Sequence, residues 1–202
     1  MTKPQSYIFI GRAGSGKGTQ GKLLVEALKK ADPGRSDLYI ETGAEFRKFM
    51  QGEQYTAKLS KRLVESGGLM PEFMPVYLWG KLLVEAYTGE QHIVFDGTPR
   101  KLLEAQVLDQ MFPFYGLEMP WVIYLDVEHE ESAKRLSLRA QKGGRKDDGP
   151  EAIEKRRVAY ERDVKPTVDW YRANPNVRFL DIDGERSIEE IHADIVKKVG
   201  LA

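Results

Sequence analysis

The glycine-rich segment at residues 11–20, GRAGSGKGTQ, has the composition of a binding site for phosphate groups. Glycine allows backbone torsions that turn successive N–H groups toward one point, and the positive end of a following helix would face the same point. Lys17 adds a positive charge within reach of the outer phosphates, and Thr19 adds a hydroxyl near a bound metal ion. We therefore expect a nucleotide phosphate site here; the alternative is a glycine-rich turn without a ligand.

Five short apolar runs provide the expected framework for this segment. None of them alternates cleanly between apolar and polar residues, so each predicts a strand buried on both faces of a sheet. Amphipathic helical patterns lie between them, and this alternation predicts βαβ units and one parallel sheet. The runs cover residues 7–10, 38–40, 93–95, 121–125 and 177–180.

This framework places two further features. Asp96 follows the third run, at the carboxyl edge where ligands bind in open α/β sheets. A carboxylate there suits magnesium, and the alternative is an aspartate that caps the next helix. Further along, Gly149-Pro150-Glu151 predicts the start of a helix on which Arg156 and Tyr160 share one face.

The composition fits one domain and excludes several classes of protein. Lys plus Arg and Asp plus Glu each number 31, so the 202-residue chain has no net charge, which argues against a dedicated nucleic-acid binder. Cysteine is absent, which excludes disulfide scaffolds, thiol catalysis and cysteine-ligated zinc sites. No apolar run approaches the roughly 18 residues of a membrane span, and the N-terminal segment is too short for a secretory signal. We expect a single cytoplasmic domain over residues 1–202.

The glycine-rich segment resembles the phosphate loop of adenylate kinases and related nucleoside monophosphate kinases. In these proteins glycine stands where the common motif has its hydroxyl, and threonine follows one residue later, as at Gly18 and Thr19. The resemblance covers nearly the whole chain, because further segments match in the expected order. They are Thr42-Gly43 with Arg47, GGLMP at 67–71, FDGTPR at 95–100, and the arginines Arg135, Arg139, Arg145 and Arg156.

This resemblance implies a P-loop NTPase-type α/β fold, with a five-stranded parallel sheet flanked by helices and two small mobile inserts. Residues 42–75 would close over the monophosphate, and residues 141–148 would form a short lid over the triphosphate. The implied reaction is reversible phosphoryl transfer from MgATP to a nucleoside monophosphate, most directly ATP + AMP ⇌ 2 ADP. Mg²⁺ is the implied cofactor and small-molecule nucleotides are the implied partners. Without cysteine we expect no zinc, and we expect a monomer with no nucleic-acid or membrane partner.

The matched positions carry the implied roles residue by residue. Those implied for ATP are Gly14, Ser15, Gly16, Lys17, Gly18, Thr19, Arg135, Arg139 and Arg186. Those implied for the monophosphate are Thr42, Gly43, Arg47, Leu69, Met70, Gly97, Arg100 and Glu104. Catalysis by charge neutralisation is implied for Lys17, Arg100, Arg139, Arg145 and Arg156, and a metal site for Asp96 and Thr19. Taken singly, Arg135 and Arg139 each fit an ordinary exposed arginine better than a ligand contact.

The absence of a poised general base agrees with such a transfer. None of the three histidines lies in a motif. The attacking phosphate oxygen is already anionic at neutral pH, so positioning and charge neutralisation supply nearly all of the catalysis.

Three positions depart from the usual adenylate kinase pattern, and they bear on the base of the monophosphate. Thr98 replaces an aromatic residue, Ala44 replaces an acid, and Glu104 stands where a glutamine usually reads AMP. An ionised carboxylate only accepts hydrogen bonds, so it would match the N1 and N2 donors of guanine better than adenine. A shifted alignment that presents Gln106 is the other interpretation.

Because Thr42 is typical of AMP-specific members, we favour AMP. The alternatives are a kinase for GMP, UMP or CMP, and a nucleotide-binding module without turnover.

Overall fold

A five-stranded parallel sheet forms the centre of the computed structural model, which describes residues 3–66, 68–142 and 149–201. The strand order is β2-β3-β1-β4-β5. This confirms the predicted α/β fold. The strands are β1 (Ser6–Gly11), β2 (Asp37–Glu41), β3 (His92–Asp96), β4 (Trp121–Asp126) and β5 (Arg178–Asp183).

The first four strands match the predicted runs to within one residue at each end, whereas the prediction for the fifth, 177–180, is wrong at its C-terminal end. β5 continues through Asp181 to Asp183. As an edge strand it has one solvent-facing side, and both of these aspartates are exposed. The apolar run therefore ends before the strand does.

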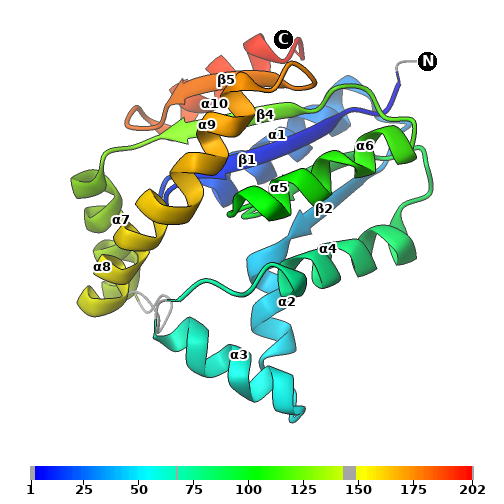
Figure 1. Cartoon of the computed structure of the whole chain (residues 1–202). Helices are drawn as coiled ribbons and strands as arrows, with labels where there is room; N and C mark the ends of the chain where they lie inside the picture. The colour runs from blue at the N-terminus through cyan, green and yellow to red at the C-terminus, as the bar shows by residue number, and fades with distance from the viewer. Residues whose placement is uncertain (1–2, 67, 143–148, 202) are drawn as a thin grey trace.

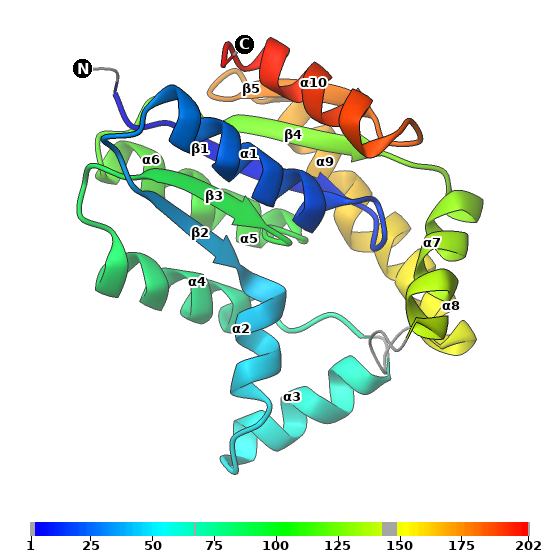
Figure 2. The ribbon, with the colours of Figure 1, turned by 180° about the vertical axis from the view of Figure 1, so that it is seen from behind.

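Helices cover both faces of the sheet, as a comparison of Figures 1 and 2 shows. Tyr7 and Phe9 of β1 pack toward one helical layer and Ile8 and Ile10 toward the other, and all four are at most 2% exposed. Burial on both faces explains why the strand sequences do not alternate. One layer consists of α1 (Lys17–Ala31) and α10 (Ile188–Lys198); the other consists of α4 (Phe73–Ala86), α5 (Leu102–Asp109), α6 (Met111–Phe114) and α9 (Lys165–Ala173).

The remaining helices lie beyond the carboxyl ends of the strands (Figure 2). α2 (Thr42–Phe49) and α3 (Tyr55–Glu65) follow β2, and α7 (His129–Gln141) follows β4. α8 (Pro150–Ala159) begins at the predicted proline and leads through a π-helical turn, η1 (Tyr160–Val164), directly into α9. Because parallel strands all end at one edge, these helices surround one common space.

The predicted inserts correspond to different amounts of described structure. Residues 42–75 include α2, α3 and the beginning of α4. Most of the predicted lid, residues 143–148, lies outside the described residues. In the ranges that the structure describes, no helix combines the length and apolar character required to cross a membrane.

Candidate functional site

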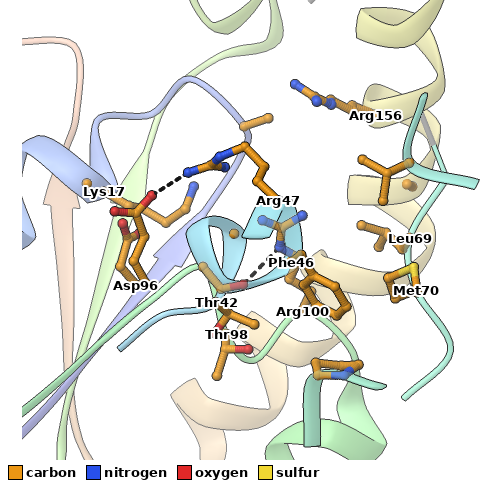
Figure 3. Close-up of a pocket in the computed structure, with 18 of the residues that line it drawn as sticks. Lys17, Thr42, Phe46, Arg47, Leu69, Met70, Asp96, Thr98, Arg100 and Arg156 are labelled. Carbon is orange, nitrogen blue, oxygen red and sulfur yellow. Dashed lines mark hydrogen bonds and ion pairs between the residues drawn. The ribbon is translucent and has the colours of Figure 1, made fainter. Parts of the chain in front are cut away.

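A cleft of about 1060 Å³ opens at the carboxyl edge of the sheet. The phosphate loop forms one wall, α2 and the segment 68–70 form another, and α7 and α8 close the third. Figure 3 shows Lys17, Arg47, Arg100 and Arg156 extending toward the same space from different elements. The cleft therefore gathers cationic side chains that are far apart in the sequence.

The phosphate loop between β1 and α1 requires glycine at two of its positions. Gly14 and Gly16 have φ values of +82° and +98°, in the left-handed region that other residues rarely adopt. A Cβ atom at Gly14 would also lie 3.0 Å from the carbonyl oxygen of Ser132 on α7. The loop thus packs closely against α7, and α1 begins immediately after it, so that Lys17, Gly18 and Thr19 of its first turn line the cleft.

Lys17 folds back over this loop. Its Nζ donates to the carbonyl oxygens of Gly11 at 2.9 Å and Arg12 at 2.5 Å, and to Oγ of Ser15 at 3.3 Å. Ser15 is only 1% exposed and does not itself line the cleft, whereas Lys17 does. In this state the ammonium group stabilises the loop conformation from the side of the cleft.

Asp96, at the end of β3, presents a largely buried carboxylate to the cleft. The Tyr39 hydroxyl donates to its Oδ2 at 3.1 Å. Burial, and the charge of Asp96, raise the pKa of Tyr39, so this phenol stays neutral and keeps its proton for the carboxylate. A Cβ atom at Gly18 would lie 3.1 Å from the same Oδ2, so a larger residue at this position would crowd the carboxylate. Thr19 lines the cleft nearby.

On the α2 side, two arginines that line the cleft donate hydrogen bonds to other residues of the chain. Arg47 Nη2 donates to Oε1 of Glu41 at 2.8 Å, and Arg100 Nε donates to the carbonyl oxygen of Gly97 at 2.9 Å. Thr42, the first residue of α2, is 3% exposed, and its hydroxyl has no hydrogen-bond partner among the described residues. A buried polar atom at the edge of a cleft requires a partner, which a water molecule or a ligand would supply.

Glu104 and Thr98 form a buried pair at the bottom of this side. Glu104 is 2% exposed, and its Oε1 accepts from the Thr98 hydroxyl at 2.6 Å while its Oε2 accepts from the backbone N–H of Arg100 at 2.8 Å. Burial raises the pKa of Glu104, against the opposing effect of these hydrogen bonds. Glu104 and Thr98 line the cleft, whereas Gln106, the alternative candidate, is exposed on α5 and does not.

Arg135 and Arg139 on α7 and Arg156 on α8 line the cleft opposite α2. Arg135 Nε donates to Oε1 of Glu131 at 2.7 Å, one turn earlier on the same helix. Arg145 lies outside the described residues. Arg186 does not line the cleft: its Nη2 pairs with Oδ2 of Asp194 at 2.8 Å, beside α10, so its ATP role stays a prediction without a supporting contact.

Leu69, Met70, Gly43 and Gly97 also line the cleft as the sequence indicated. Three residues that sequence reasoning missed contribute to the same region. Phe46 lines the cleft one helical turn after Thr42 (Figure 3), Tyr39 donates a hydrogen bond to Asp96, and Arg12 links the loop to the carbonyl oxygen of Val127. The spacing of Phe46 from Thr42 was a usable signal, whereas the roles of Tyr39 and Arg12 depend on tertiary contacts.

Several carboxylates line this cleft, but the described residues do not group them into a complete metal site. Across residues 3–66, 68–142 and 149–201, no three His, Cys, Asp or Glu side chains are grouped so that they could hold a metal ion by themselves. Mg²⁺ usually binds through one or two carboxylates together with water and phosphate oxygens, so a single carboxylate such as Asp96 is compatible with it.

Comparison with known proteins gives a consistent result. A family model described as adenylate kinase matches residues 9–176. A protein from Phocaeicola vulgatus named adenylate kinase is 32% identical over 194 residues, which cover 96% of this chain and 97% of that protein. Proteins of the same name from Parabacteroides distasonis and Leptospira biflexa are 32% and 33% identical, over 96% and 95% of this chain and 97% and 98% of their own lengths.

Proposed function

This chain belongs to the adenylate kinase family, and we propose that it catalyses the reversible reaction MgATP + AMP ⇌ 2 ADP. Membership of the family makes it a phosphotransferase; the identity of both nucleotides is the proposal. The observation that carries it is the cleft, in which a glycine loop with Lys17 faces a second cationic group, Arg47 and Arg100, across one continuous space. Two phosphate-binding groups in one cleft are what transfer between two nucleotides requires.

The triphosphate would occupy the side formed by the phosphate loop and α7. Loop N–H groups and the start of α1 bind its phosphates, and the Lys17 ammonium exchanges its loop acceptors for phosphate oxygens. Arg135 and Arg139, one turn apart on α7, would contact the base and the phosphates respectively. An anionic ligand would also relieve the repulsion between these two cations.

The monophosphate would occupy the side formed by α2 and the segments 68–70 and 97–104. Arg47 and Arg100 can each bind phosphate through two parallel N–H bonds, which requires Arg47 to release Glu41. The Thr42 hydroxyl, which has no hydrogen-bond partner in the part of the chain described, would gain one from the nucleotide. Leu69 and Met70 supply apolar surface beside the base.

Asp96 and Thr19 are the residues that would hold Mg²⁺. The fit rests on the largely buried Asp96 carboxylate at the strand edge, which is oriented by a hydrogen bond from Tyr39, and on the Thr19 hydroxyl in the same cleft wall. When bound, Mg²⁺ supplies positive charge to the outer phosphates of the triphosphate.

Catalysis then requires no general base. None of the described residues that line the cleft is a histidine, and the attacking oxygen of a monophosphate is anionic at neutral pH. Lys17, Arg100, Arg139 and Arg156 would neutralise charge around the transferring phosphoryl group, with Arg145 joining them from the lid. In this proposal residues 42–75 and 141–148 close over the two nucleotides and exclude water.

A second candidate substrate is a monophosphate with another base. Glu104 favours it, because an ionised carboxylate accepts hydrogen bonds and matches the two donors of guanine. Burial favours the opposite outcome. It raises the pKa of Glu104, and a protonated carboxyl donates one hydrogen bond and accepts another, as adenine N1 and N6 require.

The test is a coupled assay of ADP formation with MgATP and each of AMP, GMP, CMP, UMP and dTMP. We expect the highest kcat/KM with AMP. Replacement of Arg100 by Ala should lower that value by about two orders of magnitude or more. Arg178→Ala is the matched control, since Arg178 pairs with Glu118 at the opposite edge of the sheet. Preference for another monophosphate would contradict AMP specificity, and no turnover with any of them would contradict the proposed function.

A further inference from the structure

Arg12 is the second residue of the phosphate loop, yet its side chain lies outside the cleft. It lines a separate cavity of about 10 Å³ with residues of α7, α8 and η1, including Arg156 and Tyr160. A cavity of that size has room for about one water molecule, so these groups are closely packed. The Arg12 side chain is only 15% exposed.

Three contacts fix the Arg12 guanidinium group. Its Nε donates to the carbonyl oxygen of Val127 at 3.1 Å, and its Nη2 donates to Oε1 of Glu161 at 2.8 Å. Its central carbon lies 3.8 Å from the centroid of the Tyr160 ring, within cation–π distance. A planar, five-donor group is suited to making all of these contacts together, and a lysine ammonium is not.

Tyr160 is held from its other end as well. Its hydroxyl lies 2.7 Å from the hydroxyl of Tyr124, which donates to Oδ1 of Asp126 at 2.8 Å, so the Tyr160 hydroxyl is the donor in the first pair. Tyr160 and Glu161 are the first two residues of η1. Single π-helical turns of this kind are rare and occur frequently at functional sites.

Arg156 lies one helical turn before Tyr160, on α8, and extends into the cleft (Figure 3). We infer that Arg12 is a positioning residue that fixes Arg156 relative to the phosphates held by the loop, by clamping Tyr160 and Glu161 against that loop. The inference rests on the proposed function, because the position of Arg156 matters only where charge develops in the cleft.

A positioning role of Arg12 and a purely structural role predict different kinetic effects. If Arg12 only stabilised the fold, its loss would lower the melting temperature and leave kcat unchanged. If it acts through Arg156, its loss lowers kcat while KM for the monophosphate, which is bound on the far side of the cleft, changes little. The effect then depends on the presence of Arg156.

A double-mutant cycle tests this dependence. We expect Arg12→Ala to lower kcat by about tenfold or more, because small displacements of a catalytic group have effects of that size. In the Arg156→Ala background the same substitution should change kcat by less than about twofold, since the group through which it acts is absent. Equal losses of kcat in both backgrounds would overturn the positioning role.

Two further variants make the cycle decisive. Arg172→Ala is the matched control, because Arg172 likewise pairs with carboxylates, Asp169 and Asp181, and lies 5.2 Å from the Phe179 ring centroid, but does not line the cleft. It should lower stability without lowering kcat, and a loss of kcat equal to that of Arg12→Ala would also overturn the role.

Glu161→Gln should not prevent folding, because the Glu161 side chain is 40% exposed. It should lower kcat by about threefold, as expected for the loss of one partly exposed ion pair, and only where Arg156 is present. If Arg12→Ala does not fold, the cycle between Glu161→Gln and Arg156→Ala decides instead. A wild-type protein that turns over while its variants show additive losses overturns the positioning role alone. A wild-type protein without turnover rejects the proposed function.

Discussion

At the scale of a single residue, burial bears on the role that we propose for Glu104 in recognising the base. Its carboxyl group is 2% exposed, and burial raises its pKa, so the neutral form persists to higher pH than in an exposed glutamate. The neutral form donates and accepts, whereas the ionised form only accepts. We therefore expect KM for AMP to be low below the pKa of Glu104 and to rise as pH increases through it.

Steady-state kinetics over the range of about pH 5 to 9 would measure this change, with Glu104→Gln as the matched variant. Glutamine donates and accepts at every pH, so that variant should show no rise from this source. The phosphate group of AMP itself titrates near pH 6, but it does so equally for both proteins, and the difference between their profiles isolates Glu104. Parallel profiles would contradict a titrating Glu104.

Other residues show where prediction from sequence ends. The glycines of the loop and Lys17 were predicted by type and spacing, because phosphate binding restricts both, whereas the arginine roles came from the resemblance to a family. Their partners were not predicted. That Glu41 holds Arg47, or that Tyr39 holds Asp96, depends on which atoms meet across β2, α2 and β3. No local pattern in the sequence encodes those side-chain contacts.

At the scale of elements, α10 begins with a capping box that the sequence encodes completely. The Ser187 hydroxyl accepts from the Glu190 N–H at 3.2 Å, and the Glu190 carboxylate accepts from the Ser187 N–H at 3.0 Å. Ser187→Ala should therefore lower the free energy of unfolding by about 1 kcal/mol, and the melting temperature by about 2–4 °C.

Differential scanning calorimetry would measure this loss of stability. Because α10 packs on the face of the sheet with α1 and does not line the cleft, kcat should stay unchanged. Glu189→Gln, one residue away in the same first turn but outside the capping box, should leave the melting temperature within about 1 °C of the wild type. An equal loss in both variants would contradict a stabilising effect specific to the cap.

The continuous helix formed by α8, η1 and α9 shows how far secondary structure could be predicted from the sequence. Its start at Pro150 was predicted correctly, since proline at the first position and an acid in the first turn are local signals. Its π-helical turn was not predicted. The turn coincides with Tyr160, whose ring and hydroxyl meet Arg12 and Tyr124 from distant segments. The π-helical turn therefore coincides with contacts between distant elements, which the local sequence of the helix does not encode.

For the whole molecule, the parallel sheet explains why a site assembled from distant segments was predictable in outline. Every strand ends at one edge, so the residues that follow β1, β2, β3 and β4 meet around one cleft. The predicted place of Arg186 in this cleft was not found in the structure. That residue follows β5, the edge strand, and its pairing with Asp194 keeps it with α10.

The same arrangement predicts that the cleft consists of two separable halves. A ligand at about 100 times its Kd adds about 2.7 kcal/mol to stability, which corresponds to a rise in melting temperature of about 5–10 °C here. Lys17→Ala should abolish the rise caused by a non-hydrolysable ATP analogue with Mg²⁺ and keep the rise caused by AMP. Arg100→Ala should do the reverse, because the two residues lie on opposite sides of the cleft, on α1 and after β3.

Thermal melts of each variant with each nucleotide would measure the four shifts. Arg178→Ala, whose ion pair with Glu118 lies at the amino edge of the sheet, should retain both. If either Lys17→Ala or Arg100→Ala loses both shifts while remaining folded, the two nucleotides share one undivided site, and transfer between two separately held phosphates is excluded. If each variant loses only its own shift, the gap between the loop and Arg100 is the place where the phosphoryl group crosses.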